Sequence, residues 1–383
     1  MRQIHVMHVM HSFDIGGIEQ ALAEEVNGMN SDEFRHSICV FSPQFEAMSK
    51  IRSDRKLETF IIKRRFRNDP SVLFRLVRLM RKERPDVVHT RNWGGAEGIL
   101  AAVLAGVRGI IHAEHGFDYE EIEERARKKR RIFARRFLLK MCKKVVVVSK
   151  NVQNWLIETV KVDAGKLIRI HNGCDLMKFH PGREPEKRKE LGIRETDIVI
   201  GTVGRLKALK NPEASLRAFS DLALSEPRLK LMFVGDGPQK GELIAKAREK
   251  NVLDRVIFTG NMKDLAPYYR VMDLFVLSSL SEQCPKAVVE AMASGLPIVA
   301  TDVGDVREML GGDKGGIVIT PRDDYAMAQG IGFFLKNQRS AEEKGKFVRE
   351  RAELLFGLDR VIRDYAALYK EVLIDKLGNN LWE

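Results

Sequence analysis

IVIGTVGRLKALKNPE, residues 198–213, has the pattern of a buried β-strand that leads through a basic turn into an α-helix. The run Ile198–Val203 is apolar and rich in β-branched residues, as expected for a parallel strand covered on both faces. Pro212 suits the first helical turn, where its missing N–H is no loss. Because ligands of open parallel sheets bind at the carboxyl ends of strands, the turn is a candidate binding site.

Arg205 and Lys210 lie in that turn, just ahead of the predicted helix. A guanidinium and an ammonium beside a helix N-terminus favour a diphosphate, because both charges add to the helix dipole. On spacing alone, a pair of solvated surface cations is the alternative.

The same strand–turn–helix unit recurs along the 383 residues. Pro70 and Ser149 mark two helix starts, as a first helical residue and as a cap. Strand–helix alternation in two series predicts an α/β protein with two doubly wound Rossmann-like domains. The predicted strands of the first series are Ile4–Met10, Ser37–Phe41, Val87–His89, Ile110–Ala113, Val145–Val148 and Leu167–Ile170. Those of the second are Ile198–Val203, Lys230–Val234, Val256–Thr259, Leu274–Leu277, Ile298–Thr301 and Ile317–Ile319.

A polar stretch with two prolines, His180–Asp197, separates the two series, and we interpret it as the interdomain connection. The predicted domains are residues 1–178 and residues 179–357. Residues 358–383 have a helical pattern with no strand after them. They could finish the second domain or cross back onto the first.

A second candidate site begins in SEQCPKAVVEAMASGLPIVATD, residues 281–302. Pro285 suits the first helical position, which leaves the backbone N–H groups of Cys284, Lys286 and Ala287 to face an anion.

Two glutamates flank that helix start: Glu282 precedes it, and Glu290 lies more than one turn into the helix. Glu290 is placed to accept hydrogen bonds from two vicinal ribose hydroxyls, and Glu282 to hold a sugar nearer the diphosphate. The spacing therefore fits a nucleotide-sugar lying across the helix start, and two unrelated surface glutamates are the alternative.

Glycine-rich turns follow two further strands. Gly16 and Gly17 stand where a helix begins, and their backbone N–H groups can meet an anion without obstruction. Gly235 begins a similar turn, in which Asp236 could equally cap the next helix. A tight turn is the common alternative for such pairs.

The composition limits the class of protein. Four scattered cysteines without a C-x-x-C pair argue against a zinc site or a disulfide framework and favour a reducing cytoplasm. The N-terminus lacks a signal-peptide pattern, and no apolar stretch is long enough to span a bilayer. A net charge of +12 favours anionic partners. Nucleic acid is disfavoured, because no recognition motif accompanies the charge.

The segment Arg125–Lys144 concentrates that charge, with eleven Lys or Arg and no acidic residue. Phe133, Phe137 and Met141 recur within it at helical spacing, as an apolar stripe flanked by cations. Such a helix can lie on an anionic membrane surface. Equally, the stripe could face the core.

Taken together, the motifs resemble those of family-four glycosyltransferases with the GT-B fold. They occur in the family's order over most of the chain, which makes the match specific. The matching pieces are GGIE at 16–19, VVVVSKNV at 145–152, HNGCDLMKFHP at 171–181, VGRLKALKN at 203–211, VGDGP at 234–238, FTG at 258–260 and the block from Glu282 through GLPIVATDVG. AGVRGIIHAEHGFD further resembles sugar transferases of exopolysaccharide gene clusters.

The resemblance implies two Rossmann-like domains facing a cleft, with the C-terminal helix crossing back to the first domain. It also implies roles in the second domain. Arg205 and Lys210 would hold the donor diphosphate, Glu290 the ribose and Glu282 the donor sugar. The glycine-rich turn and the helix start add Gly235, Cys284, Pro285 and Lys286 to the predicted donor site.

In the first domain, the resemblance implies that Gly16 and Gly17 close on the phosphates. His115 matches the family histidine beside the anomeric carbon, although a lone histidine after a strand is more often structural. Two departures put the sugar's identity in doubt: Gln283 and Cys284 replace Gly-Phe, and Asp305 stands where a second glycine is usual. Cys284 has no sign of activation, and we interpret it as a wall residue.

The expected activity is transfer of a sugar, with retention, from a nucleoside-diphosphate sugar to a lipid-linked or polysaccharide acceptor in cell-surface or exopolysaccharide biosynthesis. No cofactor or metal is expected, since no Asp-x-Asp pair follows a strand. The expected location is the cytoplasm, with peripheral contact at the inner face of the membrane. The alternatives are a nucleotide-sugar epimerase of the same fold and an inactive nucleotide-sugar-binding subunit.

Overall fold

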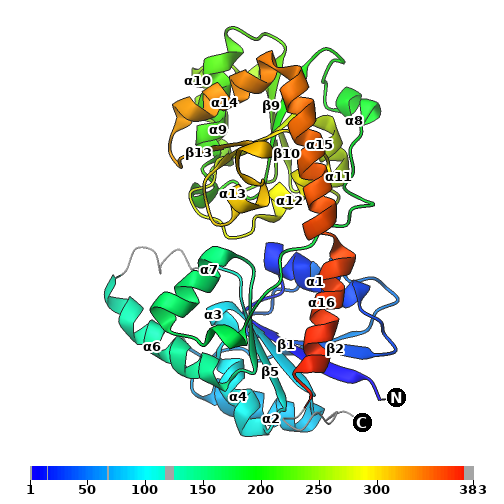
Figure 1. Ribbon diagram of the computed structural model, residues 1–383, viewed down its shortest axis with the longest axis vertical. Helices are drawn as coiled ribbons and strands as arrows, with labels where there is room; N and C mark the ends of the chain where they lie inside the picture. The colour runs from blue at the N-terminus through cyan, green and yellow to red at the C-terminus, as the bar shows by residue number, and fades with distance from the viewer. Residues whose placement is uncertain (1, 15, 67–68, 117–124, 375–383) are drawn as a thin grey trace. The chain divides into compact units, whose positions relative to one another are not determined.

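The computed structural model describes residues 2–14, 16–66, 69–116 and 125–374 (Figure 1). Contacts along the chain divide it into two compact units. The first comprises Met1–His171 and Leu358–Glu383, and the second comprises Asn172–Gly357.

The first unit is built on a seven-stranded parallel sheet in the order β3-β2-β1-β4-β5-β6-β7. Its strands are β1 Ile4–Met10, β2 Phe34–Val40, β3 Leu57–Ile61, β4 Val87–Arg91, β5 Gly109–Glu114, β6 Lys144–Val147 and β7 Leu167–Arg169. Its helices are α1 Gly17–Gly28, α2 Ser71–Glu83, α3 Asn92–Gly95, α4 Glu97–Ala105, α6 Arg125–Met141, α7 Lys150–Trp155 and α16 Leu358–Glu371.

Alternating side chains of β1 enter two different cores. Met7 and Val9 join a core that α2, α4 and α6 cover, whereas Ile4 and Val6 join a core completed by α16. The predicted return of the C-terminal helix to the first domain is therefore confirmed. Residues 375–383, the end of that predicted segment, lie outside the described part of the chain.

The second unit has a six-stranded parallel sheet in the order β10-β9-β8-β11-β12-β13. Its strands are β8 Ile198–Val203, β9 Leu229–Val234, β10 Val256–Gly260, β11 Leu274–Leu277, β12 Ile298–Thr301 and β13 Ile317–Ile319. Its helices are α8 Pro185–Glu190, α9 Pro212–Ala223, α10 Lys240–Glu249, α11 Ala266–Val271, α12 Lys286–Ala293, α13 Val306–Met309, α14 Asp324–Lys336 and α15 Gln338–Leu355.

All twelve predicted strands occur, with ends that differ by a few residues at most, and the α/β prediction is confirmed. The helix after Ser149 is capped as predicted, because the Ser149 hydroxyl accepts from the Val152 N–H at 3.1 Å. Pro70 lies at the N-cap position, one residue before the start of α2, instead of at the first helical position. The sequence analysis missed β3, a half-exposed edge strand whose polar residues hide the pattern.

The boundary between the units follows His171, earlier than the predicted end at residue 178. Cys174 belongs to the second unit because its N–H donates to the Phe356 carbonyl at 2.8 Å. The polar stretch His180–Asp197 also lies inside the second unit and contains α8, so it is not the connection between units.

Candidate functional site

The second sheet reverses its strand order between β8 and β11, which are hydrogen-bonded neighbours although two strands separate them in sequence. Open α/β sheets bind ligands at the carboxyl ends of strands at such a point. The loop after β8 carries Arg205 and Lys210, and the loop after β11 carries Glu282. The fold therefore explains why these loops meet.

Lys210 and Glu282 form an ion pair at this point. The Ser279 hydroxyl also donates to Glu282 Oε1, at 2.8 Å. The loops are tied together by their backbones as well, because the Leu280 N–H donates to the Leu209 carbonyl at 2.8 Å. The two residues predicted to hold a diphosphate and a sugar are thus in direct contact.

Lys207 adds a third cation to the loop, one that the sequence analysis overlooked. Burial and the neighbouring charges of Lys210 and Arg205 lower the pKa of the Lys207 ammonium. The Arg205 side chain is exposed. A loop that crowds three cations against one carboxylate is suited to an anionic ligand.

The helix start that follows β11 lies one residue later than predicted. Pro285 has extended backbone and precedes the first helical residue, Lys286. The Pro285 carbonyl accepts the N–H of Val288 at 3.0 Å. Cys284 and Pro285 are both buried, and the Cys284 carbonyl accepts from the Asn172 side chain at 2.7 Å. The Cys284 thiol forms no disulfide, so it remains consistent with a wall residue.

Glu290 is only 2% exposed on α12. The Tyr269 hydroxyl donates to its Oε2 at 2.9 Å, and the same hydroxyl lies 3.2 Å from the Ala287 carbonyl oxygen. Burial and then the Glu290 carboxylate raise the pKa of Tyr269 well above its usual value, which keeps it a donor. The sequence analysis missed Tyr269, because α11 carries no motif. Tyr269 therefore orients one carboxylate oxygen of Glu290, the residue predicted to bind the ribose.

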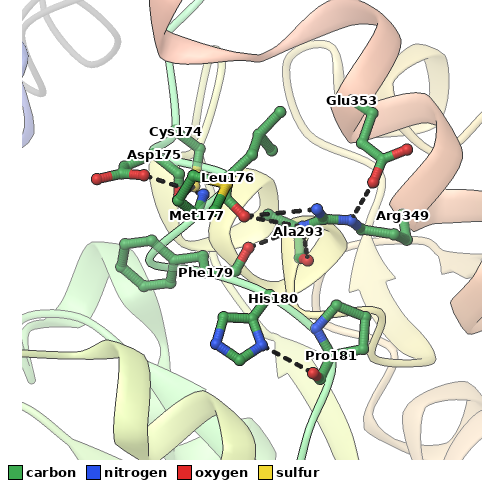
Figure 2. A network of polar contacts seen from close by, with 10 residues as sticks. All are labelled: Cys174, Asp175, Leu176, Met177, Phe179, His180, Pro181, Ala293, Arg349 and Glu353. Atoms are coloured by element: carbon green, nitrogen blue, oxygen red, sulfur yellow. Dashed lines mark hydrogen bonds and ion pairs between the residues drawn. The ribbon is translucent and has the colours of Figure 1, made fainter.

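A polar network supports α12 from its other end (Figure 2). Arg349 of α15 donates to the Ala293 carbonyl at 2.6 Å and to the Phe179 carbonyl at 2.8 Å, and pairs with Glu353 at 2.6 Å. The Phe179 ring meets the Tyr269 ring edge-on, with centroids 5.6 Å apart. Arg349 and Phe179 thus connect α15 to the tyrosine that holds Glu290.

Gly304 is the glycine that matters most beside the Glu282 loop. It has φ +56°, and a Cβ there would lie 2.5 Å or less from the carbonyl oxygens of Glu282 and Gln283. The Asp305 N–H donates to the Gln283 carbonyl at 2.9 Å. Gln283 and Asp305, which both belong to the departures from the family pattern, are buried against this turn.

Gly235 follows β9, and its backbone has φ +139°. A Cβ at this position would lie 2.2 Å from the Gly204 carbonyl oxygen. A glycine is therefore required at position 235, because the loops after β8 and β9 pack closely there. Asp236 holds the same turn by accepting from the Gly237 N–H at 2.7 Å, and it does not cap α10, which begins later at Lys240.

Gly16 and Gly17 of the first unit begin α1 as predicted, with Gly16 as the cap and Gly17 as the first helical residue. Glu19 folds back over Gly16, since a Cβ on Gly16 would lie 2.3 Å from Glu19 Oε2, whereas the space beside Gly17 is open. Burial, together with the charge of Asp14, raises the pKa of Glu19. A carboxyl group thus already lies over this helix start.

His115 follows β5 and is half-buried. The backbone N–H of His115 donates to Asn92 Oδ1 at 2.8 Å, and its ring Nε2 lies 3.4 Å from Arg91 Nη1. Burial, then the charges of Arg91 and His112, lower the pKa of His115 to about 3. His115 is therefore a neutral imidazole at physiological pH.

Behind His115 lies a buried polar layer between the sheet and the helices α1 and α16. Its members are His8, Glu25, His36, His89, Arg91, Tyr365 and Tyr369. Arg91 pairs with Glu25 at 2.5 Å, and His89 Nδ1 lies 2.7 Å from the Tyr369 hydroxyl. His8, Glu25 and His89 each place a ligand atom within 4.8 Å of the others. The Arg91 guanidinium already neutralises Glu25, which disfavours a metal cation there.

The basic helix α6 places its apolar stripe mostly outward. Phe133 is 72% exposed and Phe137 is 53% exposed, whereas Met141 packs against the core. The alternative that the whole stripe faces the core is therefore wrong. The side chains of residues 125–128 lie outside the described part of the chain. Within the described residues, no helix is long and apolar enough to cross a membrane.

Two family models match this chain. One, described as Glycosyltransferase Family 4, matches residues 15–178, and the other, Glycosyl transferases group 1, matches residues 183–351. With the paired Rossmann-like sheets, these matches confirm the GT-B fold. The chain belongs to the family-four glycosyltransferases.

Individual proteins support the same assignment. The UDP-Gal:alpha-D-GlcNAc-diphosphoundecaprenol alpha-1,3-galactosyltransferase of Escherichia coli is 28% identical over 332 residues, which are 84% of this chain and 85% of that protein. A glycosyltransferase structure from Rickettsia africae matches 98% of this chain and 100% of its own, with a TM-score of 0.82 and 19% identity. Anabaena HepE in complex with UDP and glucose matches 95% of this chain and 99% of its own, with a TM-score of 0.80 and 19% identity. At such identities the structures show the fold.

Proposed function

We propose that this protein transfers a sugar, with retention, from a nucleoside-diphosphate sugar to a lipid-linked or polysaccharide acceptor in cell-surface or exopolysaccharide biosynthesis. The observation that carries the proposal is the contact between Lys210 and Glu282 at the strand-order reversal of the second sheet. The similarity to a diphosphoundecaprenol-dependent galactosyltransferase supports the lipid-linked acceptor.

In this proposal the donor diphosphate binds the cations of the loop after β8 and the start of α12. Negative charge grows on the diphosphate as the bond to the sugar breaks, so preorganised cations stabilise the transition state more than the ground state. Arg205 and Lys210 supply that charge. The departing phosphate oxygen takes the acceptor's hydroxyl proton while the acceptor oxygen bonds the same face of the anomeric carbon. No separate base is then required.

Glu282 has two tasks in this scheme. Before the donor binds, its carboxylate neutralises and orients Lys210. When the diphosphate takes over Lys210, Glu282 is released to accept a hydrogen bond from a sugar hydroxyl. Because of this exchange, the diphosphate binds Lys210 and the sugar contacts Glu282 in the same event.

The experiment that tests the function incubates the protein with a panel of labelled nucleotide-sugars, with and without lipid-diphosphate and glycan acceptors. Labelled sugar should appear on an acceptor with its anomeric configuration retained. Epimerised nucleotide-sugar without transfer would identify an epimerase instead. Binding with neither reaction would identify an inactive binding subunit.

The two glutamates should separate in kinetics. Glu290→Gln should weaken the nucleoside diphosphate and the complete donor alike, because the ribose is common to both. Glu282→Gln should lower the saturated rate by about tenfold or more, since sugar-orienting contacts count most in the transition state. It should not weaken the free nucleoside diphosphate, because the substitution releases Lys210 from its ion pair.

Calorimetry with the nucleoside diphosphate and steady-state kinetics on both variants measure these effects. Tyr269→Phe provides a graded control, since it removes only one hydrogen bond to Glu290. If Glu282→Gln weakened the free nucleoside diphosphate as much as Glu290→Gln, the assigned division of labour would be wrong.

We expect no divalent-metal requirement, because Arg205 and Lys210 can neutralise the diphosphate without a metal ion. Activity measured after dialysis against EDTA should match activity with added magnesium or manganese. Loss of turnover in EDTA that manganese restores would contradict the assignment of the charge-neutralising role to these side chains.

We further propose that α6 holds the enzyme against an anionic membrane surface, where a lipid-linked acceptor resides. Exposed Phe133 and Phe137 lie one helical turn apart, and Lys129, Arg130, Arg136 and Lys140 are exposed on the same helix. Apolar side chains flanked by cations suit the interface of an anionic bilayer.

Replacing those four cations with glutamine should release the protein from anionic liposomes, because each contributes about 1 kcal/mol near the surface. Sedimentation with vesicles at low and high salt measures the effect. The matched control replaces exposed cations of the second unit, at Arg248, Lys250, Arg339 and Lys346. Equal loss from both quadruple variants would show that net charge, and not α6, controls adsorption.

A further inference from the structure

Arg91 connects His115 to the interior of the first unit. It is 2% exposed at the end of β4. One guanidinium nitrogen, Nη2, donates to Glu25 Oε2 at 2.5 Å, and the other, Nη1, lies 3.4 Å from His115 Nε2. A guanidinium has donors only and stays charged. The His115 Nε2 in this contact must therefore be the acceptor.

The orientation of Arg91 is fixed from the other side. The Tyr369 hydroxyl of α16 donates to Glu25 Oε1, while Arg91 occupies Oε2. The Arg91 guanidinium carbon also lies 5.9 Å from the centre of the Tyr365 ring. Residues of α1 and α16 thus hold the guanidinium that meets His115. The C-terminal helix is part of this support.

We propose that Arg91 is a positioning residue that holds His115 as the neutral tautomer with its proton on Nδ1, where it can donate a hydrogen bond to a bound substrate. This inference rests on the proposed sugar transfer and on the place that the family resemblance implies for His115, beside the anomeric carbon. The ring nitrogens of a neutral imidazole differ, and the bond made by one nitrogen decides which of them carries the proton. Arg91 makes that choice for His115, and Tyr369 and Glu25 hold Arg91 in place.

The same contact keeps positive charge off His115. Burial is the leading cause that lowers the pKa of His115, and Arg91 of β4 and then His112 of β5 lower it further. Positive charge develops on the sugar ring as a glycosidic bond breaks. An imidazolium nearby would oppose that charge, whereas a neutral Nδ1–H group donates without this penalty.

Nitrogen-15 NMR on histidine-labelled protein tests the tautomer without any substrate. The chain has nine histidines, and subtracting the spectrum of His115→Gln from that of the wild type isolates the signals of His115. The wild type should show a protonated Nδ1 and an unprotonated Nε2 at His115. Because removing Arg91 alone would strand the Glu25 charge, the test variant is the pair Arg91→Met with Glu25→Gln. In that variant the Nδ1–H preference should disappear, and Arg91→Lys should restore part of it.

Kinetics provide the second readout. The paired variant should have a kcat about tenfold lower, with little change in KM for the nucleotide-sugar. The reason is that a misplaced hydrogen-bond donor on His115 affects the transition state most. Fluorescence of Trp93 and Trp155 reports whether the first unit remains folded. A His115 proton on Nε2 in the wild type, or an unchanged tautomer in the paired variant, would overturn the inference. If the tautomer changed as expected but His115→Gln kept full activity, Arg91 would still set the tautomer, and the proposed catalytic use of His115 would fail.

Discussion

Lys210→Ala is expected to weaken nucleoside-diphosphate binding by about ten- to a hundredfold and to slow turnover at saturating donor. The removed interaction is a charge-assisted hydrogen bond to phosphate, worth about 1.5–3 kcal/mol, which corresponds to that range of affinities. Turnover should fall as well, because negative charge on the diphosphate increases as the sugar leaves. Binding and rate should therefore change together.

The structure provides a matched control for Lys210. Its side chain is 30% exposed and paired with Glu282, whereas Lys246 of α10 is 31% exposed and paired with Glu213 and Glu242. Lys246→Ala removes a cation of similar exposure and pairing from a helix outside the candidate site. Calorimetry and donor-saturation kinetics on both variants should show the loss only for Lys210→Ala. Equal affinity and rate in wild type and Lys210→Ala would place the phosphates elsewhere.

The first unit is expected to lose stability steeply as the pH falls below about 6.5, the ordinary histidine pKa. Burial is the leading cause that lowers the pKa of His36 and His115 to about 3 and of His8 and His89 well below the usual value. Above pH 6.5 these rings are neutral in both the folded and the unfolded state, so their protonation does not reduce the free energy of unfolding. Between about pH 6.5 and 3 these histidines are protonated in the unfolded chain but not in the folded unit. The free energy of unfolding therefore decreases as the pH is lowered.

Each such histidine should lower the free energy of unfolding by about 1.4 kcal/mol for each pH unit of acidification across this window. Ring nitrogens of His8, His36 and His89 are buried without a hydrogen-bond partner among the described residues, so an added proton there would lack an acceptor. Urea unfolding followed by the fluorescence of Trp93 and Trp155, both in the first unit, measures the slope at about pH 7.5, 6.5 and 5.5, across the upper edge of this window.

His36→Gln should reduce that slope, because it removes one of the buried rings. His180→Gln, at an exposed position of the second unit, should leave it unchanged. A free energy of unfolding that stayed constant between these pH values would show that the buried rings are solvated or already protonated in the folded unit.

The strands were predictable because most are uninterrupted apolar runs that burial on both faces demands. The exception, β3, lies at the sheet edge with polar, half-exposed residues, where burial imposes little pattern. The loops of the candidate site were also predictable, since strand ends carry the ligands of such sheets. The contact between Lys210 and Glu282 was not, because it depends on β8 and β11 being neighbours, and strand order leaves no local trace in sequence.

The residues that orient the site were hidden for a related reason. Tyr269, Arg349 and Arg91 lie at helix or strand positions where the local pattern predicts only packing or surface charge. Their partners come from other elements of the fold, as Phe179 does for Arg349, 170 positions away. Such polar contacts are specified by topology, whereas motifs at strand ends are specified locally.

Every role proposed for the second unit depends on binding of a nucleotide-sugar diphosphate by the loop after β8 and the start of α12. Its most direct test is a calorimetric titration of the wild-type protein, Lys210→Ala and Lys246→Ala with a panel of nucleoside diphosphates and their sugar conjugates. At least one nucleoside diphosphate should bind the wild type and Lys246→Ala equally, and should bind Lys210→Ala at least about tenfold more weakly. Binding that is indifferent to Lys210, or no binding to the wild type by any member of a panel covering the common bases, would contradict it.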